Sequence, residues 1–165
     1  MCFIFWNAFG IQAAFFYVLV YGFLVLNLFL ILTALRKTTG ETVHTLSQLR
    51  TVSRANPYLA IFLAANMFSL AGIPPLAGFF SKLFLLKALL EADLIYVAIL
   101  VVFLSVIAAV YYIRVVRFLY FDKTSFVNYK PVESLPLSYT LTLSFMINVA
   151  FIFVVDLFFY FSASL

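Results

Sequence analysis

The stretch Ser69-Leu-Ala-Gly-Ile-Pro-Pro-Leu-Ala-Gly-Phe-Phe-Ser-Lys82 lies inside the apolar window 58–86. That window exceeds the about 20 residues that a membrane-spanning helix needs. Four of its residues disfavour a regular helix: Gly72, Pro74, Pro75 and Gly78. Consecutive prolines remove backbone donors and clash with the preceding turn. The sequence therefore predicts a helix broken between Gly72 and Gly78, with a simple kink as the alternative. Transporters build ion sites at such breaks.

Lys82 closes this stretch and is the only charged residue of the window. A charge within a membrane span costs at least about 2.5–3.5 kcal/mol, so such residues usually face a bundle interior or a wet cavity. On a helix, Lys82 shares a face with Gly78 and Pro75, where small residues favour close helix packing. This placement makes Lys82 a candidate for loading and releasing a proton. In a straight helix it would instead lie near the outer interface and extend its ammonium group into water.

Composition places the whole chain in a membrane. Of its 165 residues 67% are hydrophobic and 10% are charged, and the mean hydropathy is +1.18. Soluble domains have about 45–50% apolar and about 25% charged residues. These values exclude a soluble globule, a disordered chain and a nucleic-acid-binding module. We predict a single all-α integral membrane domain over residues 1–165. Its four transmembrane helices are expected at 13–35, 58–86, 94–113 and 137–161.

The distribution of basic residues predicts the orientation. The connections after the first and third spans carry most of them: Arg36, Lys37, Arg50, Arg54, Arg114, Arg117, Lys123 and Lys130. The positive-inside rule places these connections in the cytoplasm or the mitochondrial matrix, and both termini on the outer side. Apolar residues recur at helical spacing in residues 36–57, which predicts an amphipathic inner-side loop that Asn56-Pro57 closes. Residues 122–136 contain two prolines and predict an irregular inner-side loop.

Other polar residues of the spans are candidates with weaker signals. Ser81, Ser105, Tyr111 and Tyr112 could line a proton path beside Lys82, although ordinary packing explains them equally well. Asp156 could be a proton-path carboxylate, but a position near the end of a span favours an interface or a neighbouring subunit. Asn27, Asn66 and Asn148 are expected to form interhelical hydrogen bonds.

Cofactor and metal sites are not expected. The chain contains one cysteine and one histidine, which excludes a cysteine-based metal site and Cys/His zinc chemistry. A glycine-rich dinucleotide loop and a cysteine cluster for iron–sulfur chemistry are both missing from the sequence. We therefore expect that this chain binds no cofactor.

The motif Asn56-Pro57 followed by Ser69–Lys82 closely resembles the antiporter-like membrane subunits of respiratory complex I, the NADH–ubiquinone oxidoreductase. The flanking stretches 13–21 and 105–114 resemble the helices before and after this motif, and the resemblance is strongest to the C-terminal part of the subunit 2 family. It implies the last four helices of an antiporter-like subunit. It also implies that Lys82 is the proton-exchange residue of the outward half-channel, beside the broken helix.

The resemblance further implies a non-redox subunit of a proton-translocating NADH:ubiquinone reductase that is not catalytic alone. The expected partners are other membrane-arm subunits and a separate N-terminal part of the same split subunit, in the mitochondrial inner membrane. The termini would face the intermembrane space and the basic loops the matrix. Two alternatives stay open. One is a subunit of a multi-subunit cation/proton antiporter, and the other is a structural membrane subunit that no longer carries protons.

Overall fold

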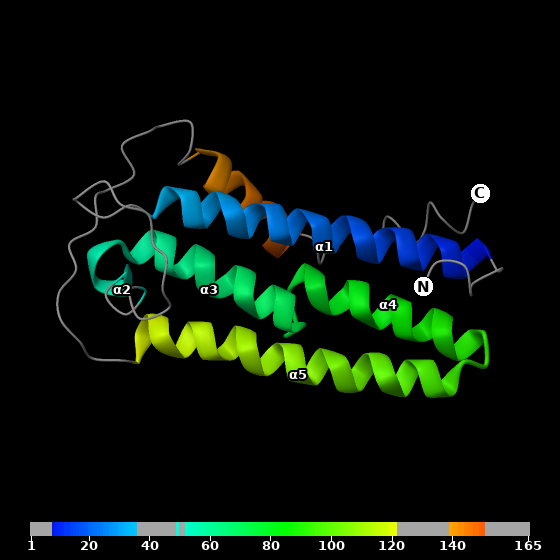
Figure 1. The fold of residues 1–165 in the computed structure, drawn as a ribbon. Coiled ribbons are helices and arrows are strands. Elements are labelled where there is room, and N and C mark those ends of the chain that lie inside the picture. Colours follow the sequence, from blue (N-terminus) through cyan, green and yellow to red (C-terminus); the bar gives the residue numbers. More distant parts are fainter. Residues whose placement is uncertain (1–7, 36–48, 50–51, 122–138, 151–165) are drawn as a thin grey trace.

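The computed structural model describes residues 8–35, 49, 52–121 and 139–150, and the labelled elements in this part of the chain are helices (Figure 1). Their bounds are α1 Ala8–Ala34, α2 Val52–Ala55, α3 Pro57–Ala71, α4 Ala77–Glu91 and α5 Ile95–Tyr120. A further helix covers Tyr139–Ala150 and is called the last described helix below. No strand occurs in the described residues. The all-helical architecture agrees with the predicted class.

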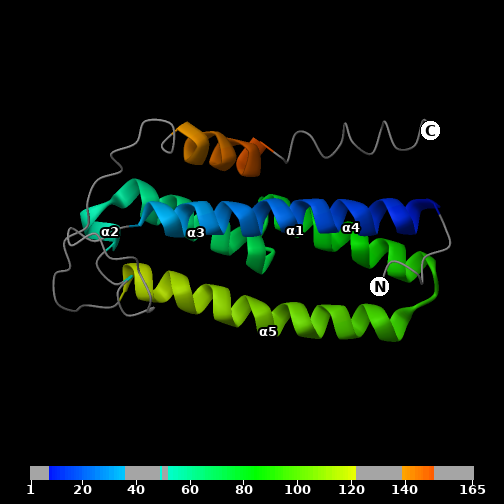
Figure 2. The same ribbon diagram turned by 45° about the horizontal axis from the view of Figure 1, so that its top comes forward.

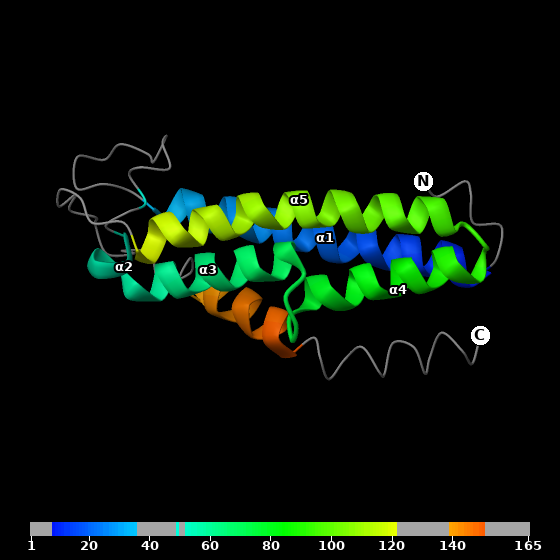
Figure 3. The same ribbon diagram turned by 90° about the horizontal axis from the view of Figure 1, so that it is seen from below.

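The helices form an antiparallel bundle around an interrupted central element. α3 and α4 follow one another along the bundle, and α1 and α5 both pack against this pair (Figures 1 and 3). α1 and α5 run in the direction opposite to α3 and α4. The last described helix lies beside α1 and α3, and it ends near the connection between α3 and α4 (Figures 2 and 3). Three helices, α1, α5 and the last described helix, therefore pack around the interrupted α3–α4 pair.

Small side chains allow this close packing. Ala13 of α1 and Ala88 of α4 belong to one buried cluster, and Ala60 and Ala64 of α3 belong to another. A third cluster, with Phe16, Val20, Leu24, Leu70 and Ala77, surrounds the interruption itself. Small residues at helix interfaces let backbones approach closely where lipid removes the hydrophobic driving force between helices. Most large apolar side chains of α5 are exposed, as expected for a helix that faces lipid or another subunit.

In the part of the chain that the structure describes, two helices are long and apolar enough to cross a membrane, Phe9–Ala34 and Ile95–Tyr120. The first begins before the predicted boundary at residue 13. The second continues beyond the predicted end at residue 113 and includes Arg114 and Arg117. The apolar window marks the part of α5 that suits lipid. Beyond it, Arg117 lies in the last turn of α5, where a cation is favoured by the helix dipole.

The predicted span 58–86 is two helices, since α3 ends at Ala71 and α4 begins at Ala77. The interruption is shorter than predicted because Gly78 lies in the first turn of α4 rather than in the break. α3 begins with Pro57 at its first position, where a proline needs no hydrogen-bond donor. Most of loop 36–57, loop 122–136 and the part of span 137–161 that contains Asp156 lie outside the described residues.

Candidate functional site

The C-terminal end of α3 leaves four carbonyl groups without partners inside the helix. Gly72 follows the helix in the left-handed region, with φ +86°, a conformation that glycine adopts without strain. Its N–H donates to the carbonyl oxygens of Phe68 and Ser69, at 3.1 and 3.0 Å. The backbone thus satisfies the first two carbonyls, and those of Leu70 and Ala71 remain for other donors.

Lys82 donates to these two remaining carbonyls. Its Nζ lies 2.9 Å from the oxygen of Leu70 and 3.0 Å from that of Ala71, and the side chain is partly buried. The side chain therefore reaches back across the break instead of extending toward the C-terminal end of α4. A positive charge at this place also faces the negative end of the α3 dipole. Lys82 acts as the C-terminal cap of α3 from a neighbouring helix.

The N-terminal end of α4 receives its cap from α3 in return. Ser69 is fully buried, and its Oγ accepts the backbone N–H of Gly78 at 3.1 Å. A Cβ atom at Gly78 would collide with the backbone oxygen of Ser69. Only glycine allows α4 to begin this close to α3. The break is therefore a defined structure in which each half-helix caps the other.

The last described helix contacts the break through a side-chain hydrogen bond. The hydroxyl of Ser69 donates to Asn148 Oδ1 at 3.0 Å, and Asn148 is buried. The same helix is bound to α1, because the hydroxyl of Ser144 donates to Asn27 Oδ1 at 2.9 Å. Asn66 donates from Nδ2 to the carbonyl of Leu24 at 3.1 Å. The three predicted interhelical roles of Asn27, Asn66 and Asn148 are confirmed.

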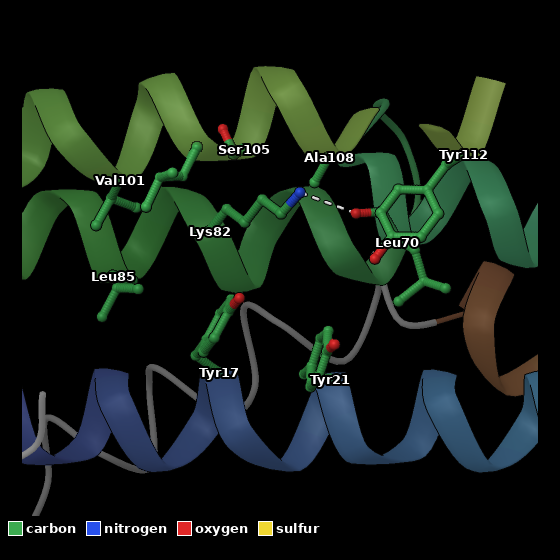
Figure 4. A pocket seen from close by; sticks show the side chains of 10 residues that line it. Tyr17, Tyr21, Leu70, Lys82, Leu85, Val101, Ser105, Ala108 and Tyr112 are labelled. Carbon is green, nitrogen blue, oxygen red and sulfur yellow. Dashed lines mark hydrogen bonds between the residues drawn. The ribbon is translucent and has the colours of Figure 1, made fainter. Parts of the chain in front are cut away.

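A cavity of about 300 Å³ lies beside Lys82, lined by α1, α5 and the ends of α3 and α4 near the break (Figure 4). Its polar lining consists of Lys82, Ser105 of α5 and three tyrosines. Tyr17 and Tyr21 come from α1, and Tyr112 comes from α5. The remaining lining residues are Leu70, Leu85, Val101, Leu104 and Ala108. A site of this size with several hydroxyl groups and an ammonium group has room and partners for water.

A second cavity of about 310 Å³ touches Lys82 on the side of the break. Ala71 and Gly72 line it together with Phe79 of α4 and part of α5. Lys82 and Ser105 are the polar side chains that both cavities share. The side chain of Lys82 therefore borders both spaces, and α5 forms a wall of each.

The structure brings together some of the predicted path residues and separates others. Ser105 and Tyr112 line the cavity of Lys82, whereas Tyr111 does not and is 63% exposed. Ser81 is buried, and its hydroxyl donates to the carbonyl of Gly78 at 3.0 Å instead of facing the cavity. Adjacent side chains on a helix point in different directions. The sequence alone therefore could not show that Tyr112, and not Tyr111, lines the cavity.

Sequence reasoning missed Tyr17, Tyr21 and Ser69. The two tyrosines are four residues apart, which places them on one face of α1, and their rings stack with centroids 6.1 Å apart. That spacing was the available signal. Ser69 stood at the start of the quoted motif, but its role depends on Gly78 and Asn148, which approach it only in the folded chain.

Among the described residues, the partners of the Lys82 ammonium group are backbone carbonyl dipoles and not an acidic side chain. Within the described residues the ion pair is Lys87–Glu91, at 3.8 Å and with both side chains exposed. No cluster of three His, Cys, Asp or Glu side chains that could hold a metal occurs in that part of the chain. An ammonium group held by neutral carbonyls beside hydroxyl-lined space can give a proton to water or a hydroxyl and later regain one.

Comparison with known proteins identifies relatives of this chain. A family model described as NADH:quinone oxidoreductase/Mrp antiporter, TM, matches residues 1–108. NADH-quinone oxidoreductase subunit N 1 of Rhizobium meliloti is 42% identical over 114 residues, 69% of this chain and 24% of the relative. Subunit N of Nitrosomonas europaea is 38% identical over 125 residues, 74% of this chain and 26% of the relative. The chain thus spans about a quarter of the length of these relatives.

Proposed function

Because this chain belongs to the NADH:quinone oxidoreductase/Mrp antiporter transmembrane family, we propose that it is a membrane subunit of a complex I type enzyme. We further propose that it takes part in proton translocation coupled to electron transfer from NADH to quinone. The names of the relatives from Rhizobium meliloti and Nitrosomonas europaea support this assignment. In this proposal the chain is a non-redox subunit and is not catalytic alone.

One observation carries the proposal. The side chain of Lys82 lines two cavities, and its ammonium group is held by the carbonyl oxygens of Leu70 and Ala71. In the proposed cycle Lys82 gives one proton to water or a hydroxyl in the cavity and becomes a neutral amine. The amine then regains a proton that arrives from the inner side. Ser105 and Tyr112 line the space in which the proton would move.

The inner part of the path would lie elsewhere in the subunit. Since the chain spans about a quarter of its relatives, the helices that bring protons from the inner side would belong to the remaining portion. A separate N-terminal polypeptide as the carrier of that portion stays a prediction. The placement of NADH, flavin and iron–sulfur centres on other subunits also stays a prediction.

The proposed location is an energy-converting membrane with the basic connections on the inner side. The two relatives above come from bacteria, so the mitochondrial inner membrane and the orientation of the termini stay predictions. Lys87 and Glu91 lie at one end of the bundle, and Arg114 and Arg117 lie toward the other. The predicted orientation in the membrane depends on this gathering of arginines toward one end of the bundle.

A second candidate is a subunit of a multi-subunit cation/proton antiporter. The family description names Mrp antiporters beside the oxidoreductase, and both activities could use the site at Lys82. The two proposals differ in their driving reaction. The first requires NADH oxidation by the assembly, and the second requires exchange of a cation gradient for protons without NADH.

The test isolates the native assembly that contains this chain, identifies its polypeptides by mass spectrometry and reconstitutes it in vesicles. We expect co-purifying complex I subunits and NADH-dependent proton uptake. Lys82→Met should lower the protons moved per NADH oxidised, whereas Lys87→Met, five positions along α4 and exposed, should leave this ratio unchanged. Unchanged pumping in assembled Lys82→Met would overturn the proton-exchange role and leave the structural subunit as the better assignment.

A further inference from the structure

The last described helix supplies a hydrogen-bond acceptor, Asn148, to Ser69 at the break. It contributes no lining residue to either cavity at Lys82. Asn148 accepts the hydroxyl of Ser69, whose oxygen in turn accepts the N–H of Gly78. Ser69 has a single proton to donate, and this bond directs it toward Asn148. With the proton committed there, a lone pair of Oγ is free for the N–H of Gly78. The orientation of Ser69 therefore depends on Asn148.

The position of Lys82 depends on the same bonds. Lys82 belongs to the second turn of α4, and Gly78 lies four residues before it in the first turn. The bond from Gly78 to Ser69 fixes the start of α4 against the last turn of α3. In this register Lys82 reaches the carbonyls of Leu70 and Ala71. A chain of contacts thus leads from Asn148 through Ser69 and Gly78 to the ammonium group.

Because Ser69 and Asn148 are buried, loss of the hydrogen bond between them is costly. Ser69 is 0% exposed and Asn148 is 1% exposed. A buried polar group that loses its partner costs more than the bond itself contributes, because water cannot replace that partner. Without the acceptor, the hydroxyl of Ser69 would turn toward a backbone carbonyl of its own helix, which is a common alternative for serine in helices. The oxygen would then present a different face to Gly78.

We propose that Asn148 is a positioning residue for Lys82 and that the last described helix controls the break through the Asn148–Ser69–Gly78 hydrogen-bond chain. Movement of this helix would loosen the junction of α3 and α4 and release Lys82 from its carbonyl partners. The positioning of Lys82 by Asn148 goes beyond the proposed function and does not require it. A consequence for proton transfer rests on the proposed function.

The chain offers an internal reference for the test. Lys82 and Lys87 stand on the same helix, the first held by two carbonyls and the second exposed. In the native assembly, reductive methylation with formaldehyde and a mild borohydride reagent reports the reactivity of each amine by mass spectrometry. The measured quantity is the methylation rate of Lys82 divided by that of Lys87, recorded as a function of pH.

Two variants of the same helix separate positioning from packing. Asn148→Leu removes the acceptor of Ser69, and Ser144→Ala removes the bond to Asn27 of α1. We expect Asn148→Leu to raise the rate ratio roughly threefold, in line with one hydrogen bond inside a membrane, and to shift its pH profile. Ser144→Ala should leave ratio and profile unchanged.

A double-mutant cycle tests whether Asn148 acts through Ser69. Ser69→Ala alone should raise the ratio as Asn148→Leu does, and the double variant should show no further increase. Equal effects of Asn148→Leu and Ser144→Ala, additive effects in the cycle, or no effect of either single variant would overturn the proposal. If Asn148→Leu does not assemble, Asn148→Ala provides the same loss of acceptor without added volume. These amine measurements are independent of pumping, so they also distinguish failure of this inference from failure of the proton-transfer role.

Discussion

Ser69 of α3 and Lys82 of α4 cap each other's helices across the break. The serine oxygen accepts the N–H of Gly78 at 3.1 Å, and the lysine donates to the last two carbonyls of α3 at 2.9 and 3.0 Å. A charged donor makes stronger hydrogen bonds than a neutral one. The junction should therefore be tightest when Lys82 carries its proton, which links the state of this amine to the geometry of the interrupted helix.

Gly78→Ala should destabilise the junction, since the added Cβ atom would collide with the backbone oxygen of Ser69. Overpacking of this kind costs about 1–3 kcal/mol. Gly22→Ala is the matched control because nothing lies within 4 Å of its added Cβ, and alanine is favoured over glycine inside a helix by about 0.5–1 kcal/mol. Retention of each variant in the solubilised assembly on heating measures the difference. A Gly78→Ala variant as stable as Gly22→Ala would contradict the close contact.

Asn66→Leu and Asn148→Leu should differ although both asparagines are 1% exposed. Asn66 Oδ1 has no partner in the described part of the chain, so leucine removes an unsatisfied oxygen along with the bond to Leu24. We expect a change in the free energy of unfolding within about 0.5 kcal/mol. Asn148→Leu leaves the buried hydroxyl of Ser69 without its acceptor and should cost about 1–3 kcal/mol. Thermal dissociation of the assembly ranks the two variants, and equal losses would refute this distinction.

Tyr112→Phe and Tyr111→Phe test the proton path at neighbouring positions. Tyr112 lines the cavity of Lys82, whereas Tyr111 is 63% exposed and lies outside it. If the cavity carries protons, loss of the Tyr112 hydroxyl removes one hydrogen-bonding station beside the lysine. We expect a severalfold lower proton-to-NADH ratio for Tyr112→Phe and an unchanged ratio for Tyr111→Phe. Proton uptake into reconstituted vesicles gives both ratios, and the reverse order would exclude this cavity as the path.

Glu91→Cys and Arg117→Cys should be accessible from opposite sides of the membrane. Glu91 ends α4, Arg117 lies in the last turn of α5, and both side chains are exposed. In a Cys2→Ser background, a membrane-impermeant maleimide should label Glu91→Cys from the outer side and Arg117→Cys only from the inner side. Labelling of both from one side would contradict the single crossing of α5. Labelling with the two sides exchanged would invert the proposed orientation.

Much of the architecture could be predicted from local sequence because the bilayer restricts the choices. Apolar length identified the regions of α1 and α5, and the two prolines predicted an interruption near residues 72–78. The exact limits could not be predicted. Gly78 belongs to α4 because Ser69 caps its N–H, and this tertiary contact is invisible in a helix propensity. The cavity lining was only partly predicted, since Tyr17 and Tyr21 approach Lys82 from a distant segment.

Local sequence was enough to predict the membrane class, the helical architecture, the interrupted helix and Lys82 as the charged residue of that helix. These features follow from composition, proline chemistry and the cost of a charge in lipid. The folded arrangement was needed to show where the ammonium group points, which hydroxyl groups line the same cavity, and that Ser69 donates a hydrogen bond to Asn148. Those features depend on the register of α3 against α4 and on which helices pack beside them. Inside a membrane, polar groups form hydrogen bonds with whichever groups the fold brings next to them, however far apart they are in the sequence.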